Sequence, residues 1–274
     1  MTDYENNAWP LPESAYVSAR RPRISGTALI GGLHLATGNY GTAPWWQLLL
    51  SGFGIVAALS AALIMTYLEL CFVDRLAGTT FSMSLLGGSQ QAGSGVMSYI
   101  EIGLQLLPMV NFLIVLRMSP LSGYHAAEHK VVAAVEAFGD IRYEQVVEMP
   151  RAHPRCGTVL LFGVIPTLLI AWPLFTRNPV AAIAVAFIGW SLRYRVGYFI
   201  QQYLTTKPPT PNQLRAGIAA GQKLLRCWQA DPDHQVSIAR NIWTRGLPQM
   251  IGGVMLGQYL MGVIYQHLHL WLDF

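Results

Sequence analysis

Charged residues are scarce in this sequence: only 12% of its 274 residues are Asp, Glu, Lys or Arg, whereas 53% are hydrophobic. The mean hydropathy is +0.36. A soluble globular domain carries about twice that share of charge, because charged side chains cover its surface. The composition therefore excludes an ordinary soluble domain. It predicts an all-α fold of the polytopic helical membrane class.

Cysteine is also rare, with only Cys71, Cys156 and Cys227 in the whole chain. They are far apart and form no C-x-x-C pair, which excludes a disulfide framework. The first 24 residues contain no long apolar run, so no secretory signal peptide is expected there. Targeting is expected to depend on internal membrane spans.

Long apolar stretches are what the sequence does contain, and the expected spans lie near residues 45–68, 100–116, 158–175, 179–203 and 247–268. The second of these carries Glu101 at its edge and Pro108 inside. The fifth is rich in glycine and contains three glutamines, so it either spans the membrane or lies on its surface.

The 18 Lys and Arg residues alternate around these stretches. The segments before, between and after the five spans hold 3, 1, 5, 1, 8 and 0 of them, when Arg193 and Arg195, in the inner part of the fourth stretch after Leu192, are counted with the segment that follows it. Because positive residues concentrate in cytoplasmic loops, this distribution predicts that the N-terminus and the loop 117–157 lie in the cytoplasm; for a bacterial protein the membrane would then be the inner membrane. The basic pI, near 9.0, then indicates membrane lipids with anionic headgroups as partners and no nucleic acid.

The loop between the second and third spans contains the sequence SGYHAAEHKVVAAVEAFGD. It predicts a helix near 124–138 with Ser122 as N-cap and Gly139 as the C′ residue. On such a helix His125 and His129 lie one turn apart on the same face and can share one ion. Glu128 can serve as a ligand or as a base, in the H-x-x-E-H order of the inverzincins. The alternative is an amphipathic helix whose His and Glu face water.

Two further features of this loop extend the candidate site. Glu136 falls on the same helix face, about 10 Å along the axis from His129, which suits a supporting role rather than a shared ion. A second motif, RAHPRCGT, contains His153 and Cys156. His153 is a ligand or a capping or core residue, and Cys156 is a ligand, a nucleophile or a small structural residue. Together the donors suit a divalent metal, with zinc the best match.

The motifs Y-H-A-A-E-H-K and H-P-R-C-G-T resemble those of the DUF1385 (YqhQ-like) family, predicted membrane proteins that are described as metal-dependent enzymes. The similarity continues through LTTKPPTPNQLRAGIAA and covers about residues 24–226. It implies a family membrane domain at 25–226, a polar tail at 1–24 and a C-terminal extension at 227–274. It also implies that the family site is formed by the five motif residues His125, Glu128, His129, His153 and Cys156. Lys130, Arg155 and Glu136 are their neighbours.

One departure from the family lies near the N-terminus. Where the family reads like GGQAVxEGVMMR, this chain has SGTALIGGLHLATG, with Gly31 in place of the family's Glu. An enzyme that needs this carboxylate is altered or inactive in this form. The nearby His34 either compensates for it or has a structural role.

The sequence favours a membrane metal-dependent hydrolase that acts near the inner leaflet, on a peptide, lipid or lipid-linked substrate. In that reading Glu128 takes a proton from an activated water molecule. The alternative is a non-catalytic scaffold, or a subunit that joins other membrane subunits, stabilised by a structural metal. A transporter is disfavoured, since few polar residues fall at mid-membrane depth.

Overall fold

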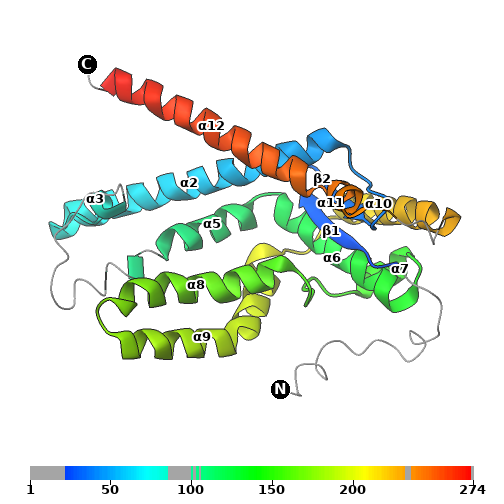
Figure 1. The fold of residues 1–274 in the computed structure, drawn as a ribbon, viewed down its shortest axis with the longest axis horizontal. Helices are drawn as coiled ribbons and strands as arrows, with labels where there is room; N and C mark the ends of the chain where they lie inside the picture. The colour runs from blue at the N-terminus through cyan, green and yellow to red at the C-terminus, as the bar shows by residue number, and fades with distance from the viewer. Residues whose placement is uncertain (1–21, 86–99, 101–102, 105, 232–235, 273–274) are drawn as a thin grey trace. The chain divides into compact units, whose positions relative to one another are not determined.

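The computed structural model describes residues 22–85, 100, 103–104, 106–231 and 236–272. The chain is mainly helical with one two-stranded sheet, as the sequence predicts for an all-α membrane protein. Its helices (Figure 1) are α2 (Trp45–Ala77), α3 (Phe81–Leu85), α5 (Leu107–Met118), α6 (Leu121–Phe138), α7 (Tyr143–Glu148), α8 (Gly157–Phe175), α9 (Pro179–Ile200), the π-helix η2 (Gln201–Thr205), α10 (Pro211–Ala230), α11 (Ile238–Thr244) and α12 (Leu247–Leu272). The predicted N-terminal tail lies mostly outside the described residues.

The chain divides into two compact units. The first contains the residues up to Ala57, Ser119–Pro154 and the residues from Thr206 onward, and the second contains Ala58–Met118 and Arg155–Thr205. The boundary falls within α2. The C-terminal extension that the sequence separates at 227–274 therefore belongs to the same unit as the predicted site helix.

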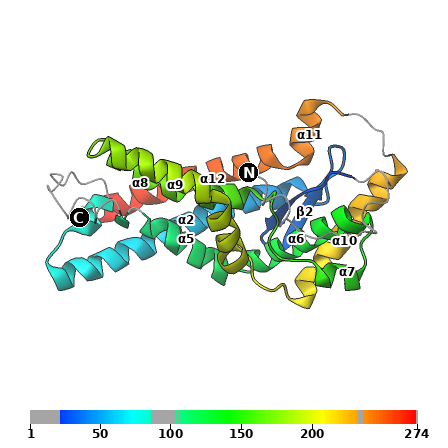
Figure 2. The ribbon, with the colours of Figure 1, turned by 90° about the horizontal axis from the view of Figure 1, so that it is seen from below.

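A β-hairpin forms part of the core of the first unit, although the sequence analysis expects only helices. Strand β1 (Ser25–Leu29) pairs antiparallel with β2 (Gly32–Ala36). Gly31 supplies the positive φ of +84° that the turn requires. The hairpin packs on α6 and α10 (Figure 2), where Leu35 and Val131 are fully buried. A methyl group at Gly221 of α10 would lie 2.7 Å from Val131, so this glycine allows the close packing.

Helix α6 is continuous over the predicted range but begins earlier than the sequence indicates. Its N-cap is Pro120, whose φ of −61° is already that of a helix. The predicted N-cap, Ser122, is wrong: it lies inside the helix, and its hydroxyl donates to the Ser119 carbonyl. Gly139 ends the helix at φ 70°, with its N–H donating to the Val135 carbonyl, as predicted for the C′ position.

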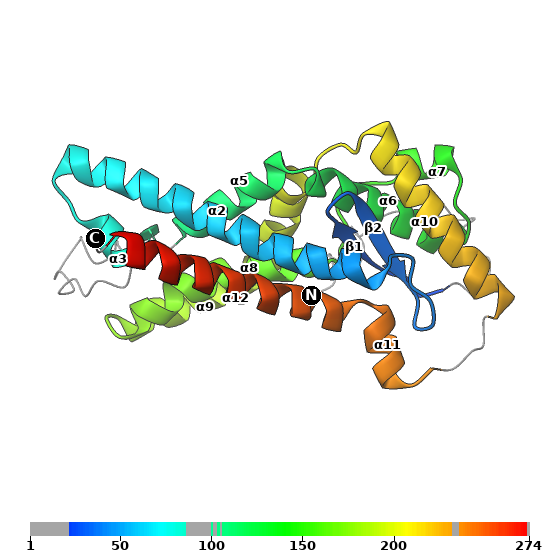
Figure 3. The ribbon, with the colours of Figure 1, turned by 90° about the horizontal axis from the view of Figure 1, so that it is seen from above.

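Helix α12 packs against the beginning of α2 within the first unit (Figure 3). A methyl group at Gly253 would lie 1.9 Å from the Leu49 carbonyl oxygen, and one at Gly257 would lie 2.9 Å from Val56. The absence of side chains at these glycines brings the two backbones together. Because the contacts advance in the same direction along both helices, α2 and α12 run parallel.

Helices α8 and α9 form an antiparallel pair in the second unit. Glycines again lie at the contacts: a methyl group at Gly163 would lie 2.1 Å from the Arg193 carbonyl oxygen, and one at Gly197 would lie 2.0 Å from that of Val159. Away from this contact the pair exposes large apolar side chains, such as Trp172 and Phe187. Exposed apolar surface of this kind suits a lipid environment.

Among the described residues, four helices are long and apolar enough to cross a membrane: Trp45–Ala77, Gly157–Phe175, Pro179–Thr205 and Leu247–His267. They correspond to the first, third, fourth and fifth predicted spans. Helix α5, in the region of the second predicted span, has only 12 residues. It is about 18 Å long at 1.5 Å per residue, shorter than the hydrocarbon core. Residues 101–102 and 105 lie outside the described residues, so a span near 100–116 stays a prediction.

Candidate metal centre

Two histidines of α6 lie against each other in the first unit. The ring centroids of His125 and His129 are 4.3 Å apart, and one ring nitrogen of each lies within 4.8 Å of the other. This is the arrangement expected for residues one helical turn apart. His129 is buried and His125 is partly exposed. The pair can therefore share one ion without rearrangement of the helix.

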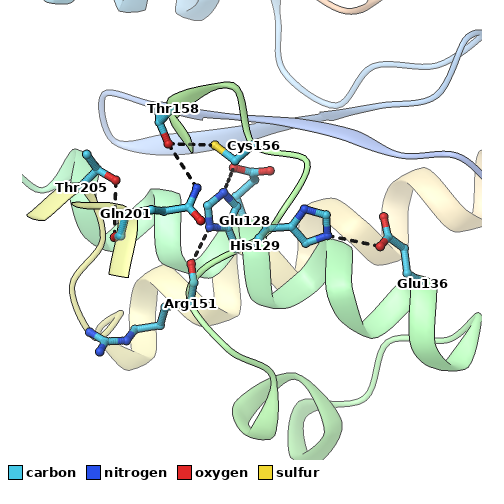
Figure 4. Close-up of polar contacts among 9 residues, drawn as sticks. Glu128, His129, Glu136, Arg151, Cys156, Thr158, Gln201 and Thr205 are labelled. Atoms are coloured by element: carbon cyan, nitrogen blue, oxygen red, sulfur yellow. Dashed lines mark hydrogen bonds and ion pairs between the residues drawn. The ribbon is translucent and has the colours of Figure 1, made fainter. Parts of the chain in front are cut away.

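The orientation of the His129 ring fixes which nitrogen has a lone pair. Its Nδ1 lies 2.5 Å from the Arg151 carbonyl oxygen, and a carbonyl can only accept, so Nδ1 carries the proton. In the neutral ring Nε2 then has the lone pair. Nε2 is buried and has no hydrogen-bond partner among the residues that the structure describes. Figure 4 shows the contact with Arg151.

Burial keeps the His129 ring neutral. Desolvation is the largest cause that lowers the pKa of His129 well below its usual value, and the nearby His125 lowers it further. A neutral imidazole with a buried, unpartnered lone pair is a costly arrangement unless something binds it. A metal ion can be that partner, because the neutral imidazole is the commonest protein ligand of metals.

His153 joins these two rings from the loop after α7. Its ring centroid lies 5.9 Å from that of His129. Its Nε2 donates to Glu136 Oε2 at 3.2 Å (the carboxylate is labelled in Figure 4), which places the lone pair of the neutral ring on Nδ1. Burial lowers the pKa of His153 below its usual value. In each of these two rings one nitrogen is thus held by an oxygen, as is common for imidazoles that bind metals.

Lys130 holds the loop that carries His153. Its Nζ donates to the Val147 carbonyl at 2.7 Å and also to the Met149 carbonyl. Partial burial lowers the pKa of Lys130. The lysine next to His129 in sequence therefore fastens α6 to the segment that supplies both Arg151 and His153.

Glu128 is buried beside His129, with Oε2 3.8 Å from His129 Nε2. Gly26 of β1 makes room for it, because a methyl group there would lie 2.1 Å from Glu128 Oε1. The sequence analysis assigned no role to Gly26. A glycine inside an otherwise strand-like run is the signal that marks such a close approach.

Gly31 and His34, which lie where the sequence departs from the family pattern, have structural roles in this chain. A methyl group at Gly31 would meet no atom within 4 Å. His34 is buried, its Nε2 donates to the Thr244 carbonyl at 2.9 Å, and its Nδ1 accepts from the Ala43 N–H at 3.1 Å. Both nitrogens are used, so His34 fastens the hairpin to α11 and has no lone pair to offer in place of the missing carboxylate.

Cys156 and Arg155 belong to the second unit. Arg155 is exposed, and Cys156 is the N-cap of α8. The Cys156 Sγ lies 3.2 Å from Thr158 Oγ1, which accepts from Gln201 Nε2 at 3.1 Å (Figure 4). Because the amide donates to this hydroxyl oxygen, the hydroxyl proton is available to Sγ. Chain connectivity keeps the Cys156 Cα within about 11 Å of the His153 Cα, since three residues span no more.

The described donors fit a divalent metal. Three imidazoles lie together in one unit, one of them with a buried nitrogen that lacks a protein partner. Nitrogen donors of this number suit zinc, copper or iron rather than calcium or magnesium, which prefer oxygen. The thiol of Cys156, three residues after His153, adds a sulfur donor of the kind that zinc also binds.

Comparison with known proteins gives one family and one curated relative. The family model described as "Protein of unknown function (DUF1385)" matches residues 45–196, more than half of the chain. "Uncharacterized protein YqhQ" of Bacillus subtilis (strain 168) is 32% identical over 154 residues, which cover 46% of this chain and 48% of the relative. The chain thus matches about half of the length of that relative. No solved structure matches.

Proposed function

This chain belongs to the DUF1385 family, and we propose that it is an integral membrane metal-dependent hydrolase that acts near the inner leaflet. The buried Nε2 of His129 carries the proposal, because it has a lone pair and no hydrogen-bond partner among the described residues. A buried nitrogen of this kind needs a partner such as a water molecule or an ion, and the neighbouring imidazoles of His125 and His153 favour an ion. The metal site is one part of the proposal, and the catalytic role is the other, which depends on Glu128.

The proposed ligands are the three imidazoles and the thiol, namely His125, His129, His153 and Cys156. In a catalytic site three of these four side chains would hold the ion and leave one position open, where a divalent ion such as zinc would acidify water and polarise a carbonyl or phosphoryl oxygen. Glu128 is the proposed base: its carboxylate lies 3.8 Å from the binding nitrogen of His129, takes a proton from the attacking water and returns it to the leaving group. Glu136 and the Arg151 carbonyl orient the rings.

Metal stoichiometry of detergent-purified variants tests the ligand and base roles separately. We expect His129→Ala to lose the ion, since it removes the pre-oriented lone pair. We expect Glu128→Gln to keep it, since an amide fills the same space but cannot take a proton. The matched control is His34→Gln, another buried histidine, which should retain about one ion per chain because both His34 nitrogens already bind protein groups. Loss of metal in the Glu128 variant would make Glu128 a ligand, and unchanged metal in every variant would refute the site.

A non-catalytic scaffold or complex subunit with a structural metal is the second candidate. Gly31, which stands where the family has a carboxylate, favours it, and four protein ligands would close the site. Substitution with cobalt(II) separates the two. An open site changes its visible spectrum when acetohydroxamate is added, because the hydroxamate occupies the open position. A closed site keeps its spectrum, and that result would favour the scaffold.

The parallel packing of α2 and α12 supports the predicted topology. Two helices that start on the same side need an odd number of crossings between them. Helices α8 and α9 supply two, so the segment near 100–116 is proposed as the third, with the N-terminus and the site loop in the cytoplasm. Ser89 lies outside the described residues, in the segment expected on the outer side. A cysteine placed there that reacted only from the cytoplasm would refute this topology.

A further inference from the structure

The tip of the β-hairpin lies against α2. The backbone N–H of Ile30 donates to Ser51 Oγ at 3.3 Å. A methyl group at Gly54, one turn further along α2, would lie 2.2 Å from Ile30 Cδ1. Both contacts are within the first unit. The turn of the hairpin is therefore docked on a helix that is long and apolar enough to span the membrane.

The charge pattern of α2 fixes the depth of this contact. No charged residue occurs between Trp45 and Leu68, and Glu69 is the first. The hydrocarbon core needs about 20 apolar residues of helix. Any stretch of that length within 45–68 includes both Ser51 and Gly54. The hairpin tip thus meets α2 below the headgroups, within the apolar layer.

One polar group of the tip, the Ile30 N–H, has the protein partner that such a depth requires. Backbone that is neither helix nor closed sheet is tolerated in the apolar layer only when protein groups satisfy it. Leu29 and Gly32 form the last pair of the hairpin ladder, and Ser51 accepts from the Ile30 N–H beyond that pair. The serine, an unusual residue inside an apolar helix, thereby has a specific partner.

The side chain at the tip is apolar and exposed. Ile30 is 63% exposed, although Leu29 beside it is buried. Trp46 and Leu50 are exposed on the same face of α2 as Gly54, since residues four apart share a face. Ile30 covers Gly54 and continues this face, so an apolar surface runs without interruption from the span onto the hairpin.

We propose that the hairpin tip is a membrane-contact element, with Ile30 among the acyl chains of the leaflet in which α2 begins. Gly26, which packs on Glu128, is four residues from Ile30 along β1. At about 3.4 Å per residue the two lie about 14 Å apart. The hairpin therefore anchors the Glu128 end of the candidate site at the headgroup layer, and this placement holds whether or not the site binds a metal.

Nitroxide labels at the two ends of the hairpin test this placement in phosphatidylethanolamine–phosphatidylglycerol vesicles. The full chain carries Cys71→Ser and Cys227→Ser and keeps Cys156, whose own signal is measured without an added cysteine. We expect a label at Ile30→Cys to be relaxed more by oxygen, which concentrates in lipid, than by a water-soluble nickel chelate. The matched label at Arg23→Cys, an exposed site before β1, should show the reverse order.

Gly32→Cys repeats the tip measurement, because a side chain there meets no atom within 4 Å and should not disturb folding. A tip label at either position that favours the nickel chelate as strongly as the Arg23 label would overturn the proposal. Metal content of the same samples is measured in parallel. A label in water with metal retained refutes only the membrane contact, whereas a label in lipid without metal refutes only the proposed metal site.

Discussion

Helices α6 and α8 have nearly equal lengths, with 18 and 19 residues, but opposite environments. Helix α8 is the more apolar of the two in sequence, yet it exposes Leu168 and Trp172. Helix α6 carries two histidines, two glutamates and a lysine, yet most of its residues are buried by protein. The comparison shows that an apolar sequence makes a helix compatible with lipid. Whether the helix is buried depends on the protein elements that pack against it.

The two units also differ in the kind of polar side chain that they bury. In the second unit, which contains α8, Asn111 donates to Thr66 and Glu69, and Gln201 donates to Thr158. These side chains satisfy one another, although Arg193 Nε and Gln202 Oε1 of the same unit are buried and have no hydrogen-bond partner among the described residues. In the first unit His129 keeps a buried nitrogen that has no hydrogen-bond partner among the described residues. This nitrogen differs from the unpartnered atoms of the second unit because two further imidazole rings, those of His125 and His153, lie beside it.

A charge on the exposed face of α8 should have the largest effect, which is a loss of protein stability. Leu168 is 57% exposed near the middle of the helix, and Leu168→Arg should cost about 3 kcal/mol if lipid surrounds it. The control is Val147→Arg on α7, also exposed, which should change stability by about 0.5 kcal/mol or less. Thermal stability in lipid nanodiscs measures both. Equal effects of the two substitutions would break the contrast between the units.

Loss of the Glu136 carboxylate, which accepts a hydrogen bond from His153, should have the next largest effect, which is a loss of metal affinity. Glu136→Gln weakens the hydrogen bond to the ring and should reduce metal affinity by about 10- to 100-fold. Glu144→Gln, an exposed acid of α7, is the matched control and should leave affinity unchanged. Competition with a chromogenic zinc chelator gives both constants. Equal affinities for the two variants would remove Glu136 from the site.

Removal of the lysine that fastens the site loop should have a smaller effect. Lys130→Met keeps the length of the side chain but leaves the Val147 and Met149 carbonyls without this donor. We expect a loss of about 1 kcal/mol, seen as faster amide hydrogen exchange of residues 147–153. Unchanged exchange would show that the loop is held by its apolar contacts alone.

The smallest expected effect is a pH dependence at the loop after α6. The Ile141 N–H and Arg142 lower the pKa of Asp140 below its ordinary value of 3.8. The carboxylate therefore contributes stability above pH 3.8 that is lost as the pH falls through its lower folded-state pKa. Exposure keeps this contribution small. Asp140→Asn should lower the melting temperature slightly at pH 6 and not at pH 3, and an equal shift at both would exclude the carboxylate as the cause.

Local patterns predicted the site helix well. Spacing alone placed His125 and His129 on one face, and Gly139 marked the helix end. The start was wrong because Pro120 and Ser122 both favour helix initiation, and the tertiary contact of Gln213 with the Pro120 carbonyl is not visible in the sequence. Element ends depend on such distant partners more than element interiors do.

The contacts that complete the site could not be predicted from spacing. Glu136 and His153 are 17 residues apart, and no periodicity links a helix to a loop. The approach of Gly26 to Glu128 needs the hairpin, whose short strands were hidden in a glycine-rich run. The role of Cys156 as a ligand stays a prediction, as do the metal and the second span.

The pairing of α2 with α12 has a consequence for synthesis of the chain. Gly52 and Gly253 meet partners on each other's helices, although about 200 residues separate them. At about 5–20 residues per second, the ribosome adds the last span about 10–40 s after the first. The first helix must therefore stay in the bilayer with its glycine face unpaired during that time. The unit that holds the candidate site is completed only when the end of the chain has been made.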